Sequence, residues 1–334
     1  MLTYLQAIVI GLLQGITELF PISSLGHSVL VPEWLGGSWA HLVATESRPE
    51  SPYLAFIVGL HVATALALLI LFWRDWVGIV KGFFTSIRYR RIETVYEKLA
   101  ILIIIATIPA RILGLALEHT LRTLFAKPLA AAIFLFANGF ILSFGEYLRR
   151  RAPKERAIDA TVLAESGATE TDVAVTQQVS KRDAVVIGVL QTGALFAGIS
   201  RSGITMVGGL WRGLSREEAI RFSFLLATPI ILAAGVYKVP DLFGPNGKGI
   251  HGQVLVGSIA AFFAALFAAK FLERWFQKGT LWPFAVYCFV FGGASILVFG
   301  FDLTRWVLLG AVVLGGFISG LAIVMSKRAK ANVA

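Results

Sequence analysis

The chain has 334 residues, of which 57% are hydrophobic and only 15% charged, with a mean hydropathy of +0.76 and a net charge of +10. This composition excludes an ordinary soluble domain and indicates an all-α polytopic membrane protein. The basic residues stand in short segments between apolar runs, where they set membrane orientation, so the positive charge does not indicate a nucleic-acid partner.

The first predicted element is a broken helix. A helix beginning near residue 3 should end before Pro21, because proline lacks an N–H and clashes with the preceding turn. Ser23 and Ser24 can then cap a second short helix that begins near Leu25. We therefore expect a re-entrant helix pair over residues 3–35. Such a break at membrane depth is tolerated where it is buried in protein or lines a wet cavity.

The later elements follow from the apolar runs, each long enough to cross a membrane. In the first repeat, 1–148, we expect spans at 53–72, 99–117 (interrupted at Pro109) and 129–148, with loops at 36–52, 74–98 and 118–127. A flexible cytoplasmic linker, in which a small amphipathic helix is conceivable, should occupy 149–182. The second repeat, 183–299, should hold a re-entrant pair at 184–210, a polar stretch at 212–221 and spans at 222–239, 254–271 and 281–299. The remainder, 300–334, adds a span at 306–325 and a basic tail.

The two broken helices are copies of one pattern. The first reads GLLQGITELFPISSLGHS (11–28) and aligns without a gap with GVLQTGALFAGISRSGIT (188–205). Identical residues meet, among other places, at Gly11 with Gly188, Gln14 with Gln191, Ile22 with Ile199, Ser23 with Ser200, and Gly26 with Gly203. Paired broken helices at matching places in two halves indicate a binding site at the repeat interface.

Lysine and arginine predict the topology. The basic segments near 74–98, 149–151, 274–278 and 327–330 fall on one side if each span crosses once, and that side should be cytoplasmic. Three spans separate the broken helices, so the repeats are expected to be inverted.

Glu18 is the first candidate site residue. Gln14 lies four residues before it and shares its helix face. A carboxylate in hydrocarbon is costly, so Glu18 should face a wet pocket, a metal or a cation. A purely structural pairing of Glu18 with Arg201 is the alternative. Gly11 and Gly15, on a neighbouring strip, should let another helix approach closely.

Ser24 and His27 stand three apart at the start of the second short helix. A serine there lies beside free backbone N–H groups and suits an anion. His27 could act as base, acid or nucleophile, because its pKa normally lies near neutrality. His61, in the middle of an apolar span and without such neighbours, is interpreted as structural.

The stretch 200–205, SRSGIT, has the composition of a phosphate cradle. Arg201 offers a planar fork of donors that matches phosphate oxygens. Ser200, Ser202 and Thr205 add hydroxyls, and Gly203 lets the backbone come close. The alternative is an arginine that extends to the membrane interface.

These motifs together resemble the undecaprenyl-diphosphate phosphatases of the bacitracin-resistance type. The matching segments are 14–18 (QGITE), 21–27 (PISSLGH) and 198–205 (GISRSGIT), and the resemblance covers roughly residues 2–299. It implies an integral membrane enzyme that removes the terminal phosphate of undecaprenyl diphosphate, with two re-entrant helix pairs in inverted repeats. It also implies a divalent cation, Mg²⁺ or Ca²⁺.

Several positions depart from the family pattern. Gln14 stands where an acid is common, Leu25 where threonine is usual, and Ala197 where proline is usual. The linker 149–182 and the span 306–325 exceed the family core.

The resemblance also implies the roles of the site residues. Expected catalytic residues are Glu18, Ser24, His27 and Arg201, with the nucleophile left open between Ser24, His27 and water. Expected phosphate ligands are Ser23, Ser200, Arg201, Ser202, Gly203 and Thr205, and expected metal ligands are Glu18 and Gln14.

The expected setting is the bacterial cytoplasmic (inner) membrane, with the pocket open to the periplasmic side. The expected partners are a polyprenyl diphosphate lipid and membrane lipids, not nucleic acid, and a homodimer is left open. The competing function is a transporter or flippase of a polyprenyl phosphate lipid, because inverted repeats with broken helices are typical of transporters.

Overall fold

The computed structural model describes residues 2–44, 52–125, 127–151, 159–244, 247, 249–301 and 303, and these form helices without any strand. The helices of the first half are α1 (Tyr4–Leu19), α2 (Ser24–Leu35), α3 (Gly37–Ala44), α4 (Pro52–Leu71), α5 (Trp73–Tyr89), α6 (Val95–Phe125) and α7 (Pro128–Arg151). Those that follow are α8 (Ala160–Ser166), α9 (Glu170–Gln178), α10 (Lys181–Gln191), the 3₁₀ helix η1 (Thr192–Leu195), α11 (Arg201–Trp211), α12 (Arg216–Phe243), α13 (His251–Lys278) and α14 (Trp282–Phe301).

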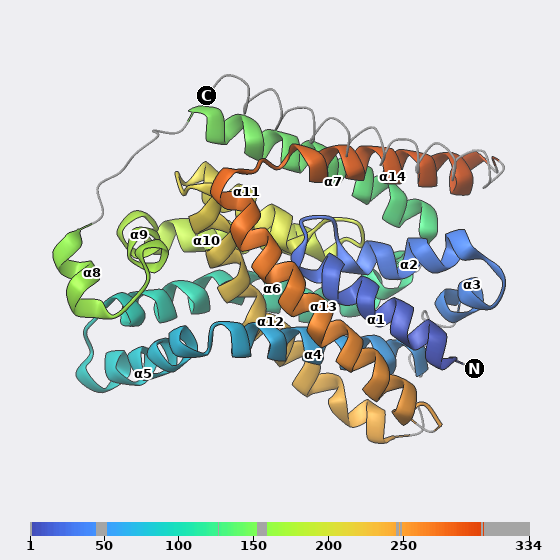
Figure 1. Ribbon diagram of the computed structural model, residues 1–334, viewed down its shortest axis with the longest axis horizontal. Helices are drawn as coiled ribbons and strands as arrows, with labels where there is room; N and C mark the ends of the chain where they lie inside the picture. Colours follow the sequence, from blue (N-terminus) through green and yellow to red (C-terminus); the bar gives the residue numbers. More distant parts are fainter. Residues whose placement is uncertain are drawn as a thin grey trace.

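The two halves are interleaved rather than placed side by side. α1 packs on α13, α10 on α6, α4 on α12, and α7 on α14. Figure 1 shows α7 and α14 running together along one edge, with α8 and α9 at one end of the molecule and α3 at the other. The central helices therefore bury their faces against helices from the opposite half of the sequence.

Both predicted helix breaks are present. α1 is capped by Thr3 and ends at Leu19, and α2 follows with Ser23 as its cap. The second break lies between the end of α10 at Gln191 and the start of α11, where the Ser200 hydroxyl accepts the N–H of Gly203. Each break thus ends in a serine-capped helix start, as the local sequence predicts.

Glycines set the spacing at the crossings of α1 and α10. A Cβ added to Gly11 would lie 2.3 Å from the carbonyl oxygen of Gly257 in α13. At the aligned position of the second copy, a Cβ added to Gly188 would lie 2.5 Å from the carbonyl oxygen of Ala106 in α6. The close helix approach expected at Gly11 is therefore confirmed, and α13 is the helix that approaches.

Several predicted loops are helical instead. Residues 37–44 of the expected loop 36–52 form α3, and most of 74–98 forms α5. The buried residues of α5 are Asp75, Ile79, Gly82 and Ser86, whose spacing is that of one helix face, a periodicity masked by the many charges around it.

α6 also corrects the sequence interpretation. It continues through Pro109, where an interruption was predicted, and through the expected loop 118–127 as far as Phe125. Proline is tolerated within membrane helices when surrounding groups satisfy the freed carbonyl, so a proline alone was a poor predictor of a break here. Likewise the polar stretch 212–221 already contains the start of α12.

The segment 149–182 is not a flexible linker where the structure describes it. α9 buries Val173, Ala174 and Val175, and its Asp172 forms an ion pair with Arg221 of α12. Packing against the core, which the polar composition did not reveal, orders this segment.

Within the described residues, four helices are long and apolar enough to cross a membrane: Val95–Leu117, Pro128–Arg150, His251–Lys278 and Trp282–Phe301. A fifth is counted if the pair Ala55–Leu71 and Trp73–Tyr89, bent by 89°, is one span. The predicted spans 99–117, 129–148, 254–271 and 281–299 fall in the four, and 53–72 falls largely in the bent pair. The predicted span 222–239 lies in α12, which is not one of them, and 306–325 lies outside the described residues. The chain is therefore a multi-pass membrane protein, helical throughout the elements that the structure describes.

Candidate active site

A cavity of about 350 Å³ lies where the two helix breaks meet. The first break contributes Glu18, Ser23, Ser24 and Leu25, and the second contributes Gln191, Ser200 and Arg201. His61 of α4 and Arg111 of α6 complete its polar wall. The structure thus brings Glu18 and Arg201 together, although they are 183 positions apart in the sequence.

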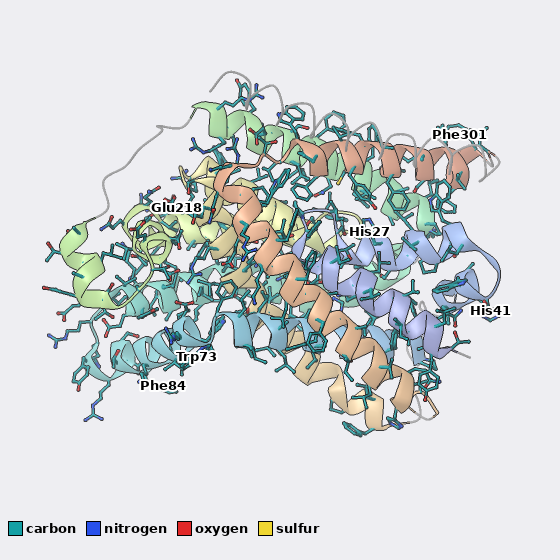
Figure 2. The ribbon with its side chains drawn as sticks, in the orientation of Figure 1. His27, His41, Trp73, Phe84, Glu218 and Phe301 are labelled. Carbon is teal, nitrogen blue, oxygen red and sulfur yellow. The ribbon has the colours of Figure 1, made fainter. Side chains whose placement is uncertain are left out.

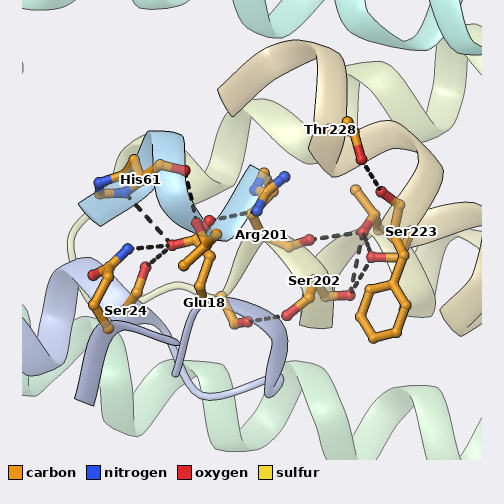
Figure 3. A network of polar contacts seen from close by, with 12 residues as sticks. Glu18, Ser24, His61, Arg201, Ser202, Ser223 and Thr228 are labelled. Atoms are coloured by element: carbon orange, nitrogen blue, oxygen red, sulfur yellow. Dashed lines mark hydrogen bonds and ion pairs between the residues drawn. The ribbon is translucent and has the colours of Figure 1, made fainter. Parts of the chain in front are cut away.

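Glu18 lies at the centre of the polar contacts in the cavity (Figure 3). Its side chain is 5% exposed, and its Oε1 accepts a hydrogen bond of 2.5 Å from Arg201 Nη2. Oε2 accepts from Ser24 Oγ at 2.5 Å and from Gln14 Nε2 at 2.9 Å, and His61 Nε2 lies 3.5 Å from the same oxygen. A buried carboxylate is stable only when its charge is paired and its lone pairs are satisfied, and these four side chains meet both conditions.

Two polar atoms of the cavity wall lack a protein partner. Arg201 Nη1 is buried and has no hydrogen-bond partner among the described residues, and the same holds for Gln191 Oε1. Leaving such groups unpaired is costly, so native proteins nearly always satisfy them. Arg201 binds Glu18 through Nη2. A ligand that accepts a hydrogen bond from Nη1 would satisfy the rest of the guanidinium.

Ser23 holds the two breaks against each other. Its backbone has φ = 72°, a left-handed conformation that is uncommon for serine. Its hydroxyl accepts the N–H of Gly26 at 3.2 Å and the N–H of Gly198, in the other break, at 3.1 Å. Gly198 has φ = 112°, and a Cβ there would lie 2.4 Å from the carbonyl oxygen of Ala131, so glycine is required at this crossing.

Asn138 of α7 is a second tie between the breaks. Its Nδ2 donates to the carbonyl oxygen of Pro21 at 2.9 Å, and its Oδ1 accepts the N–H of Ser200 at 3.0 Å. The residue is fully buried. One side chain therefore satisfies a backbone group in each break, which fixes the position of Arg201 relative to Glu18.

The predicted phosphate cradle is only partly formed. Ser200 and Arg201 line the cavity, but Ser202, Gly203 and Thr205 do not. Ser202 Oγ donates to the carbonyl oxygen of Phe20 at 3.0 Å, and Thr205 Oγ1 lies 2.7 Å from Ser223 Oγ (Figure 3). α11 begins at Arg201, so the helical turn carries the following residues away from the cavity and onto the first break and α12.

His27, an expected catalytic residue, does not line the cavity beside Ser24. Its Nε2 lies 2.7 Å from the Tyr287 hydroxyl and its Nδ1 lies 2.7 Å from the carbonyl oxygen of Ser23. Its ring stacks on Tyr287 and Phe291 of α14, and the residue is 1% exposed. Figure 2 labels His27 on α2. Ser24 donates to Glu18, whereas both ring nitrogens of His27 are engaged by Tyr287 and the Ser23 carbonyl.

The oxygen atoms that could act as metal ligands in the cavity limit how a divalent cation can bind. Both oxygens of Glu18 already accept hydrogen bonds from the protein, and Gln14 faces Glu18 with its NH₂ group. Within the described residues, no group of three or more His, Cys, Asp and Glu side chains could hold a metal ion. Mg²⁺, however, is commonly bound by one or two carboxylates together with substrate phosphates. A cation bound here would therefore have to share its ligands with a bound phosphate group.

Sequence reasoning missed three residues of this site. His61 was interpreted as structural, although a histidine in a strongly apolar span was a signal. Asn138 was a similar signal, as the amide in the run 129–148. Gln191 was noticed only as the partner of Gln14 in the alignment, and it donates its Nε2 to the carbonyl oxygen of Ala106 at 3.3 Å while its Oε1 stays unpaired.

Comparisons with known proteins show the family of the chain. An undecaprenyl-diphosphatase of Mycolicibacterium paratuberculosis is 58% identical over 300 residues, which cover 89% of this chain and 97% of the relative. An undecaprenyl-diphosphatase 2 of Frankia alni is 52% identical over 337 residues (89% and 98%), and an undecaprenyl-diphosphatase of Acidiphilium cryptum is 39% identical over 305 residues (90% and 99%). The family described as bacitracin resistance protein BacA matches residues 7–294, which include both helix breaks and every residue of the cavity, and the chain therefore belongs to that family.

Proposed function

We propose that the protein is an integral membrane phosphatase that hydrolyses undecaprenyl diphosphate to undecaprenyl phosphate and inorganic phosphate. This reaction recycles a lipid carrier of cell-wall synthesis and would contribute to bacitracin resistance. The names of the relatives and the family match support the activity, and the cavity offers a place for it.

The unpaired Nη1 of Arg201 is the observation that carries the proposal. The guanidinium is anchored on Glu18 by one arm and turned into the cavity by its position at the start of α11. Arginine binds phosphate oxygens with strong, charge-assisted hydrogen bonds, and a helix start adds a favourable dipole for an anion. The terminal phosphate would therefore lie between Arg201 and Ser24, with Ser200 beside it.

Ser24 is the proposed nucleophile. Its Oγ would attack the terminal phosphorus while the bond to the bridging oxygen breaks and undecaprenyl phosphate leaves. The hydroxyl proton would pass to Glu18 Oε2, which already accepts it at 2.5 Å, and His61 is the nearest group that could pass a proton on. Water would then hydrolyse the phosphoserine and release inorganic phosphate. In such transfers, the protein contributes mainly positioning and charge stabilisation.

The expected divalent cation, Mg²⁺ or Ca²⁺, would be held by Glu18 together with the diphosphate, whereas Gln14, which turns its NH₂ group to Glu18 and does not line the cavity, would orient that carboxylate. When bound, it would neutralise charge on the phosphate oxygens. His27 is proposed as a positioning residue, because its ring supports the Ser23 carbonyl at the break rather than lining the cavity.

The proposed membrane arrangement is a pair of inverted repeats in the bacterial inner membrane, with the cavity open to the periplasmic side. The exchanged packing of α1 on α13 and α10 on α6, with aligned glycines at both crossings, supports a two-fold relation between the halves.

Phosphate release from undecaprenyl diphosphate by the purified protein in detergent tests the proposal. A transporter of the lipid would release none, because transport leaves the phosphoanhydride bond intact. Arg201→Lys should lose about 10²-fold or more in kcat/KM, since a point charge cannot reproduce the fork that holds Glu18 and phosphate together. Arg88→Gln, which removes an exposed cation of α5, is the control and should keep the parent rate. Near-normal release by Arg201→Lys would contradict the phosphate-binding role.

A further inference from the structure

Arg111 is a cation of the cavity wall for which the described residues supply no counter-ion. It lies inside the apolar window Val95–Leu117 of α6 and lines the same cavity as Glu18 and Arg201. Among the residues that the structure describes, none forms a hydrogen bond or an ion pair with it. A charged side chain within a membrane helix is costly and is normally paired or functional. Arg111 therefore needs an explanation that its protein neighbours do not supply.

The charge balance of the cavity points the same way. Its wall carries one carboxylate, Glu18, and two guanidinium groups, Arg111 and Arg201. Glu18 offsets Arg201, to which it is bonded at 2.5 Å, so the cavity keeps a positive charge at Arg111. A low-dielectric cavity with surplus positive charge favours a ligand with more than one negative charge.

A second cavity begins where Arg111 lies. It has a volume of about 250 Å³ and is lined by α6 and α12 through Ile103, Ile104, Thr107, Ile108, Arg111, Ile112 and Pro229. Arg111 is the residue that this groove shares with the polar cavity. The isoleucines on its outer side are exposed, from 39% at Ile104 to 62% at Ile112, as expected of a helix face turned to lipid. The groove thus leads from Arg111 to the apolar surface of the protein.

We infer that Arg111 binds the phosphate that remains on the lipid, and that the first isoprene units of the prenyl chain lie in the groove between α6 and α12. This inference rests on the proposed function. A prenyl diphosphate has two charged phosphate groups followed directly by an apolar chain. The protein offers matching groups in the same order: Arg201, then Arg111, then the isoleucines of the groove. Arg111 would contribute to recognition of the lipid side of the substrate, whereas Arg201 holds the group that is transferred.

Two inhibitors separate these roles. Undecaprenyl phosphate carries only the lipid-side phosphate, and inorganic phosphate resembles only the group that leaves. In detergent without phospholipid, Arg111→Gln should weaken inhibition by undecaprenyl phosphate by about tenfold or more, the loss expected for a hydrogen bond to a charged group. Inhibition by inorganic phosphate should stay within about twofold of the parent. In Arg111→Gln, KM for undecaprenyl diphosphate should rise together with the inhibition constant of undecaprenyl phosphate. Arg88→Gln should change neither inhibition constant nor KM.

The groove is tested by Ile108→Trp, which also keeps the inference falsifiable if Arg111→Gln does not fold. The indole should raise KM for undecaprenyl diphosphate while leaving KM for a short-chain prenyl diphosphate unchanged. Equal effects of Arg111→Gln on both inhibitors, no effect on either, or an effect that appears only when an anionic phospholipid is added would overturn the role of Arg111. No chain-length dependence in Ile108→Trp would overturn the groove. If the parent protein releases no phosphate from undecaprenyl diphosphate, the proposed function is wrong as well. If the parent protein does release phosphate, the outcomes above contradict only the roles of Arg111 and the groove.

Discussion

At the scale of single residues, the site depends on one carboxylate that serves several partners. Glu18 neutralises Arg201, accepts from Ser24 and Gln14, and faces His61. Such networks are worth more than their separate bonds, because each member orients the next. The arrangement explains how a membrane-embedded glutamate can be both structurally paired and available to accept a proton, which were alternatives at the level of the sequence.

Ser24 and His27 should now behave differently from each other. Ser24→Ala should lose about 10²-fold or more in turnover with little change in Tm, because Ser24 lines the cavity and the variant removes only a hydroxyl. His27→Ala should lower Tm as well as activity, since it empties a buried site between Tyr287 and Phe291. The measurements are phosphate release and thermal unfolding of both variants in the same detergent. A His27→Ala protein with parental Tm and no turnover would restore His27 to the chemistry.

At the scale of helices, close backbone approach is the main device. α1 meets α13 at Gly11 and Gly15, and α10 meets α6 at Gly188. Small residues suit helix contacts in membranes because association there depends on packing rather than on a hydrophobic driving force. These crossings hold α1 and α10 in place and so position both breaks.

Gly11→Val should destabilise the protein by about 1–3 kcal/mol, as overpacking does in a filled interior. A Cβ at this position would already meet the backbone of Gly257 at 2.3 Å, so the helices would have to separate. Gly293→Ala in α14 is the matched control, because its added Cβ would find its nearest atom, in Phe136, at 3.5 Å. Thermal unfolding of both variants checks this, and an equal Tm for the two would show that the crossing is not tight.

The start of α10 provides a pH-dependent contribution, outside the four apolar spans. Burial raises the pKa of the Asp183 carboxyl, but the N–H and hydroxyl of Ser180 and the charge of Arg212 lower it more, so the pKa lies below its usual value. A carboxyl with a lowered pKa stabilises the folded state above its ordinary pKa, and this stabilisation is lost as the pH falls through the lowered value. Asp183→Asn should therefore lower Tm near neutral pH and flatten the decline of Tm on the acid side. Parallel Tm curves for variant and parent would contradict this.

At the scale of the whole molecule, one buried ion cluster joins distant parts of the chain. Arg221 of α12 bonds to Asp172 of α9 at 2.9 Å and to Asp75 of α5 at 2.8 Å, and its guanidinium lies 5.0 Å from the centre of the Phe72 ring. The cluster anchors α9, at the end of the molecule opposite α3, to both halves (Figure 1). It explains why the segment expected to be a flexible linker is ordered there.

Arg221→Met should destabilise the protein by about 3–5 kcal/mol, since it leaves two buried carboxylates without their cation. The variant should also expose the segment around α9 to protease before the rest of the protein. Arg88→Gln removes an exposed arginine from α5 and should leave both Tm and cleavage unchanged. An Arg221→Met protein with parental Tm and cleavage rate would show that the cluster does not hold α9.

The sequence by itself determined what depends on local rules. The apolar runs predicted the all-helical membrane class, Pro21 and the two serine caps predicted the helix breaks, and the repeated pattern predicted that Glu18 and Arg201 belong to one site. Only the tertiary structure decided which neighbours each polar group finds. His61 and Asn138 come from helices whose sequences look apolar, His27 turns to Tyr287, and Asp172 orders α9 through a partner 49 residues away. These outcomes depend on contacts between distant segments, and periodicity along a single segment carries no information about them.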